Sequence, residues 1–253
     1  NGSAIEEIAT LGAIVLFTAS DGTSGIELWR SDGTPGGTAL VKDIAPGGAT
    51  SDPSELTAVG GTLFFSADDG VNGHELWRSD GTPGGTVLVK DIRPGATDGN
   101  PFELTAAGST LFFGADDGTN GFELWKSNGT AGGTLMVADL NPTGTSNVAQ
   151  LMALGSIVLF VADDGVIGPE LHRSDGTEAG TFLVEELVAG PGGVEVADDG
   201  FGVLGSALFF SLDDGVNGPE PWRSDGTAAG SSLLAYLEPG GDGSFPADFR
   251  TVG

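Results

Sequence analysis

Five short segments of the chain repeat a glutamate followed, two residues later, by an aromatic residue. They are Glu27-Leu28-Trp29, Glu75-Leu76-Trp77, Glu123-Leu124-Trp125, Glu170-Leu171-His172 and Glu220-Pro221-Trp222. Side chains two residues apart in a strand lie on the same face, so each segment places a carboxylate beside a ring. A carboxylate in such apolar surroundings needs hydrogen-bond donors, a basic partner or a cation.

A second set of carboxylates precedes these segments. Its members stand at Asp21, Asp69, Asp117, Asp164 and Asp214, each followed by Gly. Asp69 and Glu75 bracket a glycine-rich loop, so their oxygens and those of the loop backbone could converge on one calcium ion, a cation that prefers oxygen ligands. Calcium sites built from the Asp and Glu of each repeat are therefore one hypothesis, although the spacing is not that of an EF-hand. The alternative is that each Glu accepts backbone N–H groups from the preceding Asp-Gly loop.

The aromatic positions Trp29, Trp77, Trp125 and Trp222, with His172 in the fourth repeat, also have two interpretations. As a ligand-binding set they would provide one sugar-stacking platform per repeat. As a structural set they would pack between neighbouring sheets, because a Trp side chain buries 150–250 Å². His172 then substitutes for a packed Trp.

A turn follows each of these segments and begins with Asp or Asn, then Gly and Thr. The first residues are Asp32, Asp80, Asn128, Asp175 and Asp225. We expect each side chain to cap its own turn through backbone N–H groups. Asn128-Gly129-Thr130 is also a formal glycosylation sequon. The basic residues after the aromatic positions are predicted to pair with acidic residues of the fourth strand, Arg30 with Asp43 for example.

The spacing of the repeated Glu residues defines the organisation of the chain, because it is 48, 48, 47 and 50 residues. In the second repeat, β-branched and aromatic residues at 55–59, 62–67, 74–79 and 86–92 predict four strands joined by Gly-containing hairpin turns. A four-stranded meander repeated radially is typical of a β-propeller. We therefore predict one all-β domain over 1–253, a closed five-bladed β-propeller with four antiparallel strands per blade. A linear β-solenoid is the alternative that the hairpin turns disfavour.

The predicted blades cover about 48 residues each, at 5–52, 53–100, 101–147, 148–197 and 198–245. The first-strand motif occurs once more than the other three strands, anchored for the last time by Phe249. Residues 246–253 are therefore predicted to be an extra copy of that strand, which either closes the ring as a clasp or pairs with the sheet edge of a neighbouring molecule.

Composition narrows the classes of partner. The chain has 36 Asp and Glu against 9 Lys and Arg, a formal net charge of −27, and no Cys. This charge disfavours nucleic acid, whose phosphates require Lys and Arg, and no apolar run is long enough for membrane insertion. Without Cys there is neither a disulfide framework nor a thiolate site.

The repeated motif resembles the bacterial ELWxxDGT repeat family over essentially the whole chain. Glu27-Leu28-Trp29 with Asp32-Gly33-Thr34 matches it in full, while Asn128, His172 and Pro221 are departures from it. The resemblance implies a secreted or cell-surface bacterial protein. The repeat length and blade number are also similar to those of five-bladed lectins of the tachylectin type.

No repeat carries a unique set of unlike reactive groups, which acid–base catalysis requires. We therefore predict no enzyme activity. The expected function is extracellular binding or adhesion, or structural assembly by self-association. A multivalent lectin that binds surface glycans with one site per blade is the alternative, and a propeller hydrolase is a more remote one.

Overall fold

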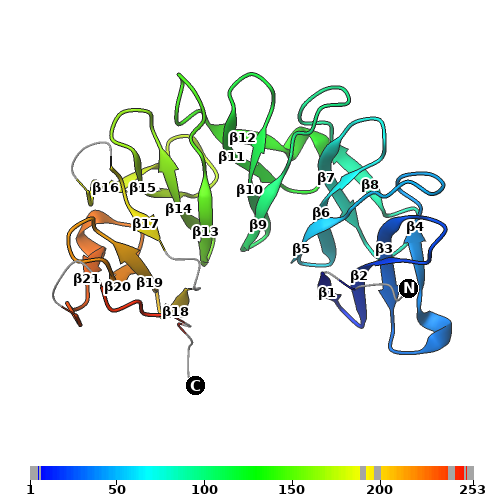
Figure 1. Cartoon of the computed structure of the whole chain (residues 1–253), viewed down its shortest axis with the longest axis horizontal. Coiled ribbons are helices and arrows are strands. Elements are labelled where there is room, and N and C mark those ends of the chain that lie inside the picture. The colour runs from blue at the N-terminus through cyan, green and yellow to red at the C-terminus, as the bar shows by residue number, and fades with distance from the viewer. Residues whose placement is uncertain are drawn as a thin grey trace. The chain divides into compact units, whose positions relative to one another are not determined.

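The computed structural model describes residue 5 and residues 7–188, 192–196, 201–238, 243–247 and 249. Regular structure in these ranges is almost entirely β-strand, arranged in five antiparallel sheets (Figure 1). The helical segments there are three single 3-10 turns, η1 (Pro35–Gly37), η2 (Ala131–Gly133) and η3 (Ala228–Gly230). The predicted all-β class and the repetition of antiparallel sheets are confirmed.

Each of the first four sheets is a meander of four consecutive strands. The first contains β1 (Ile8–Leu11), β2 (Ile14–Ser20), β3 (Ile26–Ser31) and β4 (Ala39–Lys42). The second contains β5 (Ser54–Val59), β6 (Thr62–Asp68), β7 (His74–Ser79) and β8 (Val87–Lys90). The third contains β9 (Phe102–Ala107), β10 (Thr110–Asp116), β11 (Phe122–Ser127) and β12 (Leu135–Ala138). The fourth contains β13 (Ala149–Leu154), β14 (Ile157–Asp163), β15 (Pro169–Ser174) and β16 (Phe182–Glu185).

The fifth sheet has a modified first strand. It contains β17 (Glu195–Val196), β18 (Gly202–Leu204), β19 (Ala207–Asp213), β20 (Pro219–Ser224) and β21 (Ser232–Leu233), and both β17 and β18 pair with β19. The predicted boundary at residue 197 assigns β17 to the fourth repeat, whereas its hydrogen bonds place it in the fifth sheet. The extra strand predicted at 246–253 falls mostly outside the described residues, and its described positions are not in a strand.

The second strand of each sheet is apolar without alternation, as Leu63-Phe64-Phe65 of β6 illustrates. All three side chains are at most 3% exposed. Such a continuous apolar run is typical of a strand that is covered on both faces. Hairpins join it to its neighbours, and Gly60 between β5 and β6 adopts φ +60°, a left-handed conformation that glycine tolerates best.

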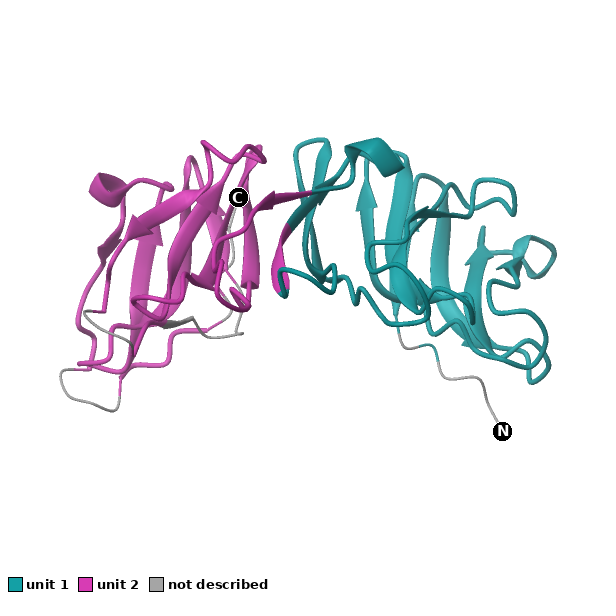
Figure 2. Ribbon diagram, turned by 90° about the horizontal axis from the view of Figure 1, so that it is seen from above, with its two compact units in different colours: residues 1–121, 125–135 teal, residues 122–124, 136–253 magenta. Residues whose placement is uncertain are grey.

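The chain divides into two compact units, residues 1–121 with 125–135, and residues 122–124 with 136–253 (Figure 2). Each unit has its own apolar core. In the first unit it is formed by residues of the first two sheets, among them Leu16, Leu28, Leu63 and Phe65. In the second unit it includes Leu159, Leu171, Leu208 and Phe210. No helix in the described part of the chain is long and apolar enough to cross a membrane.

Candidate functional site

The repeated Glu side chains are buried, and each holds the link that follows its own sheet. Glu75 is fully buried, and its carboxylate accepts hydrogen bonds from the backbone N–H groups of Ile92 at 2.8 Å and of Arg93 and Gly99 at 3.1 Å. The predicted donors in the preceding Asp-Gly loop are therefore wrong. The donors lie 17–24 residues downstream, where the chain leaves the sheet.

The other four members of this set have the same role. Glu27 accepts from Ile44, Ala45 and Ser51, Glu123 from Leu140 and Ser146, Glu170 from Leu187 and Val188, and Glu220 from Leu237, Glu238 and Ser244. Burial raises the pKa of Glu75 to about 7 and also raises the pKa values of Glu27, Glu123 and Glu170. In the fifth sheet the Ser244 hydroxyl donates to Glu220 and lowers its pKa.

The repeated Asp residues of the first loop cap that loop. The Oδ1 atom of Asp69 accepts the N–H groups of Val71 and Asn72, each at 2.9 Å, and its Oδ2 atom accepts the side-chain amide of Asn72 at 2.8 Å. Equivalent Oδ1 bonds form at Asp21, Asp117, Asp164 and Asp214.

This division of labour does not favour the predicted calcium sites. Within a repeat, N–H groups of the loop surround the Asp carboxylate, and N–H groups of the link surround the Glu carboxylate. A cation placed at either carboxylate would be repelled by these N–H donors. In the described ranges no group of three or more His, Cys, Asp or Glu side chains is placed to hold a metal ion.

The second turn has the predicted self-capped geometry. Asp80 Oδ1 accepts the backbone N–H of Thr82 at 2.9 Å and its hydroxyl at 2.6 Å, and the Thr82 hydroxyl in turn accepts the N–H of Gly85 at 3.0 Å. Asn128 forms the same pair of bonds to Thr130 at 3.1 and 2.7 Å. These turns are structural in all five sheets.

Two of the tryptophans are packed under a lysine of the preceding sheet. Trp77 and Trp125 are each 5% exposed. Lys42 Nζ lies 5.5 Å from the centroid of the Trp77 ring, and Lys90 Nζ lies 5.4 Å from that of Trp125. This arrangement is a cation–π contact, and it leaves no open ring face on which a sugar could stack.

The remaining aromatic positions differ from one another. His172 is 3% exposed, stacks on Phe160 with ring centroids 5.7 Å apart, and its Nδ1 lies 2.9 Å from the carbonyl oxygen of Glu170. Burial lowers the pKa of His172, so the ring is neutral near pH 7. Trp29 and Trp222 are only half-buried.

The basic residues after the aromatic positions reach the next sheet along the chain. Arg30 Nη1 donates to the carbonyl of Gly81 at 3.1 Å, and Arg173 Nη1 donates to the carbonyl of Gly226 at 3.4 Å. The acceptors belong to Asp-Gly-Thr turns, whereas the expectation was an ion pair with the fourth strand. Guanidinium groups therefore join successive sheets at these two junctions.

A further acidic set on the first strands was not recognised from the sequence. The Glu7 carboxylate accepts the N–H groups of Glu55 at 3.1 Å and Leu56 at 2.9 Å, and the Glu55 carboxylate accepts the N–H of Leu104 at 3.1 Å. Glu55 has φ +62°, and Glu103 has φ +53°. The signal in the sequence was a Glu immediately before the apolar anchor of the first strand in the first three repeats, at Glu7, Glu55 and Glu103.

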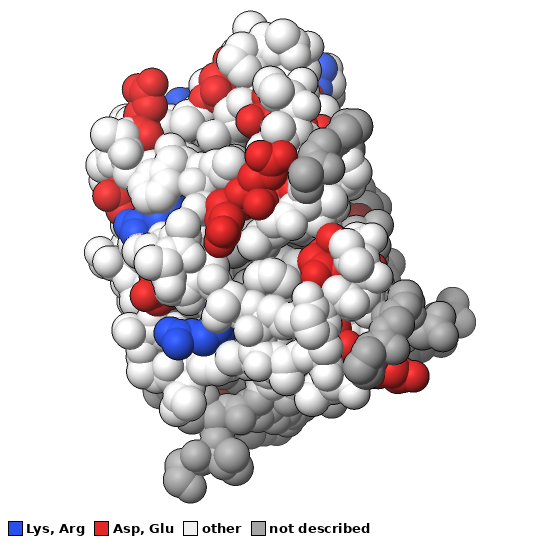
Figure 3. All heavy atoms as spheres, turned by 90° about the vertical axis from the view of Figure 1, so that its left-hand side faces the viewer, with Lys and Arg blue, Asp and Glu red and all other residues white. Residues whose placement is uncertain are grey.

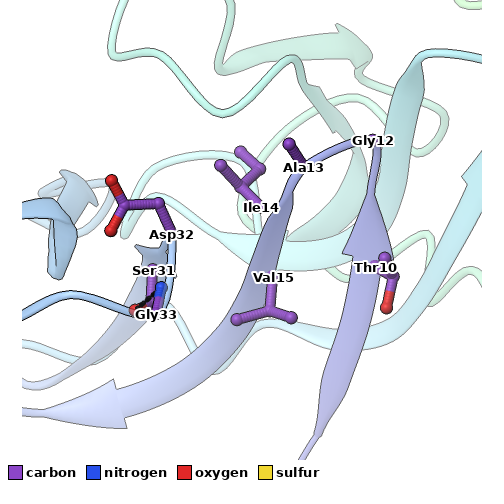
Figure 4. A pocket seen from close by; sticks show the side chains of 8 residues that line it. All are labelled: Thr10, Gly12, Ala13, Ile14, Val15, Ser31, Asp32 and Gly33. Atoms are coloured by element: carbon purple, nitrogen blue, oxygen red, sulfur yellow. Dashed lines mark hydrogen bonds between the residues drawn. The ribbon is translucent and has the colours of Figure 1, made fainter.

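A surface hollow of about 330 Å³ lies on the first sheet (Figure 4). Its lining comes from β1, β2 and the turn between them, and from the end of β3 and the turn that follows; the residues are Thr10, Gly12, Ala13, Ile14, Val15, Ser31, Asp32 and Gly33. Its lining is largely apolar and includes one acidic side chain and no base. The hollow therefore lacks the set of unlike titratable groups that a catalytic site requires.

Acidic residues predominate among the charged residues of the chain, with 36 Asp and Glu against 9 Lys and Arg. Figure 3 shows Asp and Glu side chains spread over one face of the molecule, with few Lys and Arg among them. Arg93 forms an ion pair with Asp116, and His74 Nδ1 lies 3.5 Å from Asp98 Oδ1. Because Asp and Glu outnumber Lys and Arg by 36 to 9, most carboxylates of the chain have no Lys or Arg of their own to pair with.

Comparison with known proteins shows similarity at the level of the fold. No protein-family model matches the sequence, and no curated protein matches it significantly. A puromycin hydrolase in complex with PGG has 14% identity and a TM-score of 0.57, over 97% of this chain and 39% of that one. Oligopeptidase B from Leishmania major has 15% identity and a TM-score of 0.57, over 93% and 34%. A prolyl endopeptidase has 11% identity and a TM-score of 0.55, over 98% and 37%.

These identities are low, so the likeness concerns the fold alone. It supports an all-β, propeller-like chain. The chain spans less than two fifths of the length of each of these three solved chains. The resemblance to the ELWxxDGT family stays a prediction.

Proposed function

We propose that the chain is a non-catalytic extracellular module for adhesion and assembly, built on a β-propeller scaffold of five blades. The observation that carries this proposal is the use of the repeated polar side chains. The buried Glu residues hold the links, the Asp residues cap their own turns, and the Lys and Arg residues join one sheet to the next. The repeated motif therefore stabilises the scaffold, and we expect partners to bind to exposed residues outside the motif.

The same repetition supports the proposal that the module is non-catalytic. General acid–base chemistry needs two titratable groups whose environments push their pKa values apart within reach of one substrate. Glu75 has a raised pKa, but its carboxylate is fully buried and engaged by three backbone donors. A group without access to solvent cannot reach a substrate.

A lectin with one site per blade is less well supported. Such a site presents an exposed aromatic face in each repeat, whereas Trp77, Trp125 and His172 are at most 5% exposed. If the chain binds surface glycans, we expect them at the links between sheets and at the loop tips, because binding residues on rigid scaffolds usually lie in loops.

Sedimentation velocity of the intact chain over a wide concentration range tests assembly, with electron microscopy for fibres. We expect concentration-dependent association that strengthens with added salt, because salt screens the mutual repulsion of chains of net charge −27. A glycan array in millimolar calcium, with an EDTA control, tests adhesion. A chain that stays monomeric throughout and binds no glycan would contradict the proposal.

A further inference from the structure

The buried carboxyl group of Glu75 has one acceptor position that no N–H group of the described residues occupies. Its Oε1 atom accepts the N–H groups of Arg93 and Gly99, each at 3.1 Å, which uses both acceptor positions of that oxygen. Its Oε2 atom accepts one N–H group, that of Ile92 at 2.8 Å. One position on Oε2 is therefore left over, in a side chain that is fully buried.

In two other repeats a serine hydroxyl takes this position. The Ser51 hydroxyl donates to Glu27 Oε2 at 2.6 Å, and the Ser244 hydroxyl donates to the equivalent oxygen of the fifth repeat at 2.5 Å. Each serine lies 24 residues after its Glu, and the residue at that distance from Glu75 is Gly99. The second repeat therefore has no serine hydroxyl at this point of its link.

On the same face of the second sheet, a buried oxygen of Asp91 needs a donor. Leu76 of β7 pairs with Lys90 of β8, so Glu75 and Asp91 are the next pair and point to the same face. Cβ atoms in such a pair lie about 4.5–5.5 Å apart. The N–H that Glu75 Oε2 accepts also belongs to the residue directly after Asp91. Asp91 Oδ1 is buried and has no hydrogen-bond partner among the described residues.

The charges around this pair decide which donor can join the two oxygens. Burial, and after it the charge of Asp91, raises the pKa of Glu75 to about 7. Three N–H groups point at the Glu75 carboxyl, which disfavours a metal cation there. Basic side chains on the neighbouring elements have other partners. They are Arg93 with Asp116, Lys42 with the carbonyl of Thr86, and His74 with Asp98. A proton is the donor that remains.

We propose that Glu75 keeps a proton on Oε2 near neutral pH and shares it with Asp91 Oδ1. The O–H bond gives the buried Asp91 oxygen its donor and fills the position that serine occupies in the first and fifth repeats. When the pH rises, the proton leaves to solvent, and two carboxylates remain side by side where the 92–99 link begins. Their repulsion loosens the link, so the pair is a pH-sensitive contact in the connection between the second and third sheets. This contact is independent of the proposed assembly and adhesion.

Carbon-13 NMR of the side-chain carboxyl groups tests the shared proton in the intact chain. We expect the signals of Glu75 Cδ and Asp91 Cγ to shift together with one midpoint at about pH 7, because the proton belongs to the pair. In Asp91→Asn the proton affinity of Glu75 should fall about tenfold or more, since the neighbouring negative charge is lost. Asp80→Asn is the matched control. It removes one charge from the same sheet, and Asn128 shows that Asn keeps the bonds of this turn.

A second pair of variants tests whether a hydroxyl replaces the proton. A Cβ atom on Gly99 would lie 2.7 Å from both carboxyl oxygens of Glu75, so any side chain there requires the carboxyl group to shift. Gly99→Ser and Gly99→Ala require the same shift, and the serine alone adds a donor. We expect a lower Glu75 midpoint in the serine variant than in the alanine variant, because a serine hydroxyl stabilises the ionised form, as Ser244 does at Glu220.

Hydrogen exchange measures the effect on the link. Protection factors of the Ile92, Arg93 and Gly99 amides, which correct for the intrinsic pH dependence of exchange, are expected to fall between pH 6 and 8 in the wild type, on either side of the Glu75 pKa of about 7. In Asp91→Asn they are expected to stay level, because no second carboxylate repels the ionised Glu75.

Each contrary result removes a defined part of the proposal. A Glu75 signal that titrates while the Asp91 signal stays flat would overturn the shared proton, and this wild-type titration decides even if a variant fails to fold. A midpoint that moves with added calcium and returns with EDTA would show that a cation joins the two carboxyl groups instead. If both signals shift together while the protection factors stay level, the effect on the link is wrong.

Discussion

The ammonium group of Lys42 lies over the indole ring of Trp77 and donates a hydrogen bond of 2.9 Å to the carbonyl of Thr86. One side chain of the first sheet thus satisfies a buried carbonyl and covers a buried ring of the second. The relation is repeated by Lys90 with Trp125 and Thr134. Lys42 and Lys90 therefore connect neighbouring sheets, in a chain that has only nine Lys and Arg residues.

Replacing Lys42 by Met should destabilise the fold by about 1–3 kcal/mol, since the cation–π contact and the hydrogen bond to a buried carbonyl are lost while the apolar stem remains. Urea unfolding followed by fluorescence measures the change. Lys90→Met should behave alike. Val71→Glu, which makes the same change in net charge on an exposed loop, should leave the free energy of unfolding within about 0.5 kcal/mol of the wild type. Equal changes in the free energy of unfolding for the lysine variants and this control would argue against a stabilising contact between the sheets.

Replacing Glu75 by Ala should cost roughly 3 kcal/mol or more, because the backbone N–H groups of buried Ile92 and Gly99 and of half-buried Arg93 lose their acceptor. The loss should be local at first. Hydrogen exchange at Ile92, Arg93 and Gly99 is expected to accelerate strongly, while amides within β6 and β7 keep their protection. Glu178, exposed in a turn, is the control residue, and Glu178→Ala should leave the exchange pattern unchanged. Unaltered exchange in the 92–99 link of the Glu75 variant would contradict the assigned contacts.

Stability should have its maximum in mildly acidic solution. The pKa of Glu75 is about 7 in the fold against an ordinary 4.5, so its contribution is fully present below pH 4.5 and is lost as the pH rises through 7. The pKa of Asp21, lowered by the N–H groups of its loop, is about 2 against 3.8. Its contribution is present above pH 3.8 and is lost as the pH falls through 2.

Denaturant unfolding from pH 2 to 9 measures this profile, and we expect its maximum at about pH 4–5.5. In Glu75→Gln the decline between pH 5 and 8 should be shallower than in the wild type. A wild-type curve that rises steadily from pH 4 to 8 would show that this carboxyl is ionised without penalty.

Two adjacent glycines in the second turn should respond in opposite ways to alanine. At Gly85 a Cβ atom would lie 2.0 Å from the Asp80 carboxylate oxygen that caps the turn, whereas at Gly84 it would meet nothing within 4 Å. Gly85→Ala should therefore displace the cap and cost about 1–3 kcal/mol. Gly84→Ala should be neutral or stabilise by up to about 1 kcal/mol through the unfolded chain. Thermal unfolding of the two variants side by side is sufficient, and equal shifts in Tm would count against the cap.

Features that depend on residues close together in the sequence could be predicted, whereas contacts between residues far apart in the sequence could not. The repeat, the four strands of each sheet and the self-capped Asp80 turn depend on neighbours in sequence, through side-chain alternation and the turn preferences of Asp and Gly. Strand limits in the second repeat accordingly agree with the prediction to within two residues at each end.

Tertiary structure decided which groups meet across longer distances. A buried Glu75 was foreseeable as a carboxylate in need of donors, but its donors lie up to 24 residues downstream, and only the path of the link selects them over the nearer Asp-Gly loop. The partner of Arg30 is 51 residues away, in the turn of the next sheet. Periodicity along one strand contains no information about which carbonyl a neighbouring sheet presents, so only the packing of successive sheets shows that the Lys and Arg of the repeated motif connect one sheet to the next.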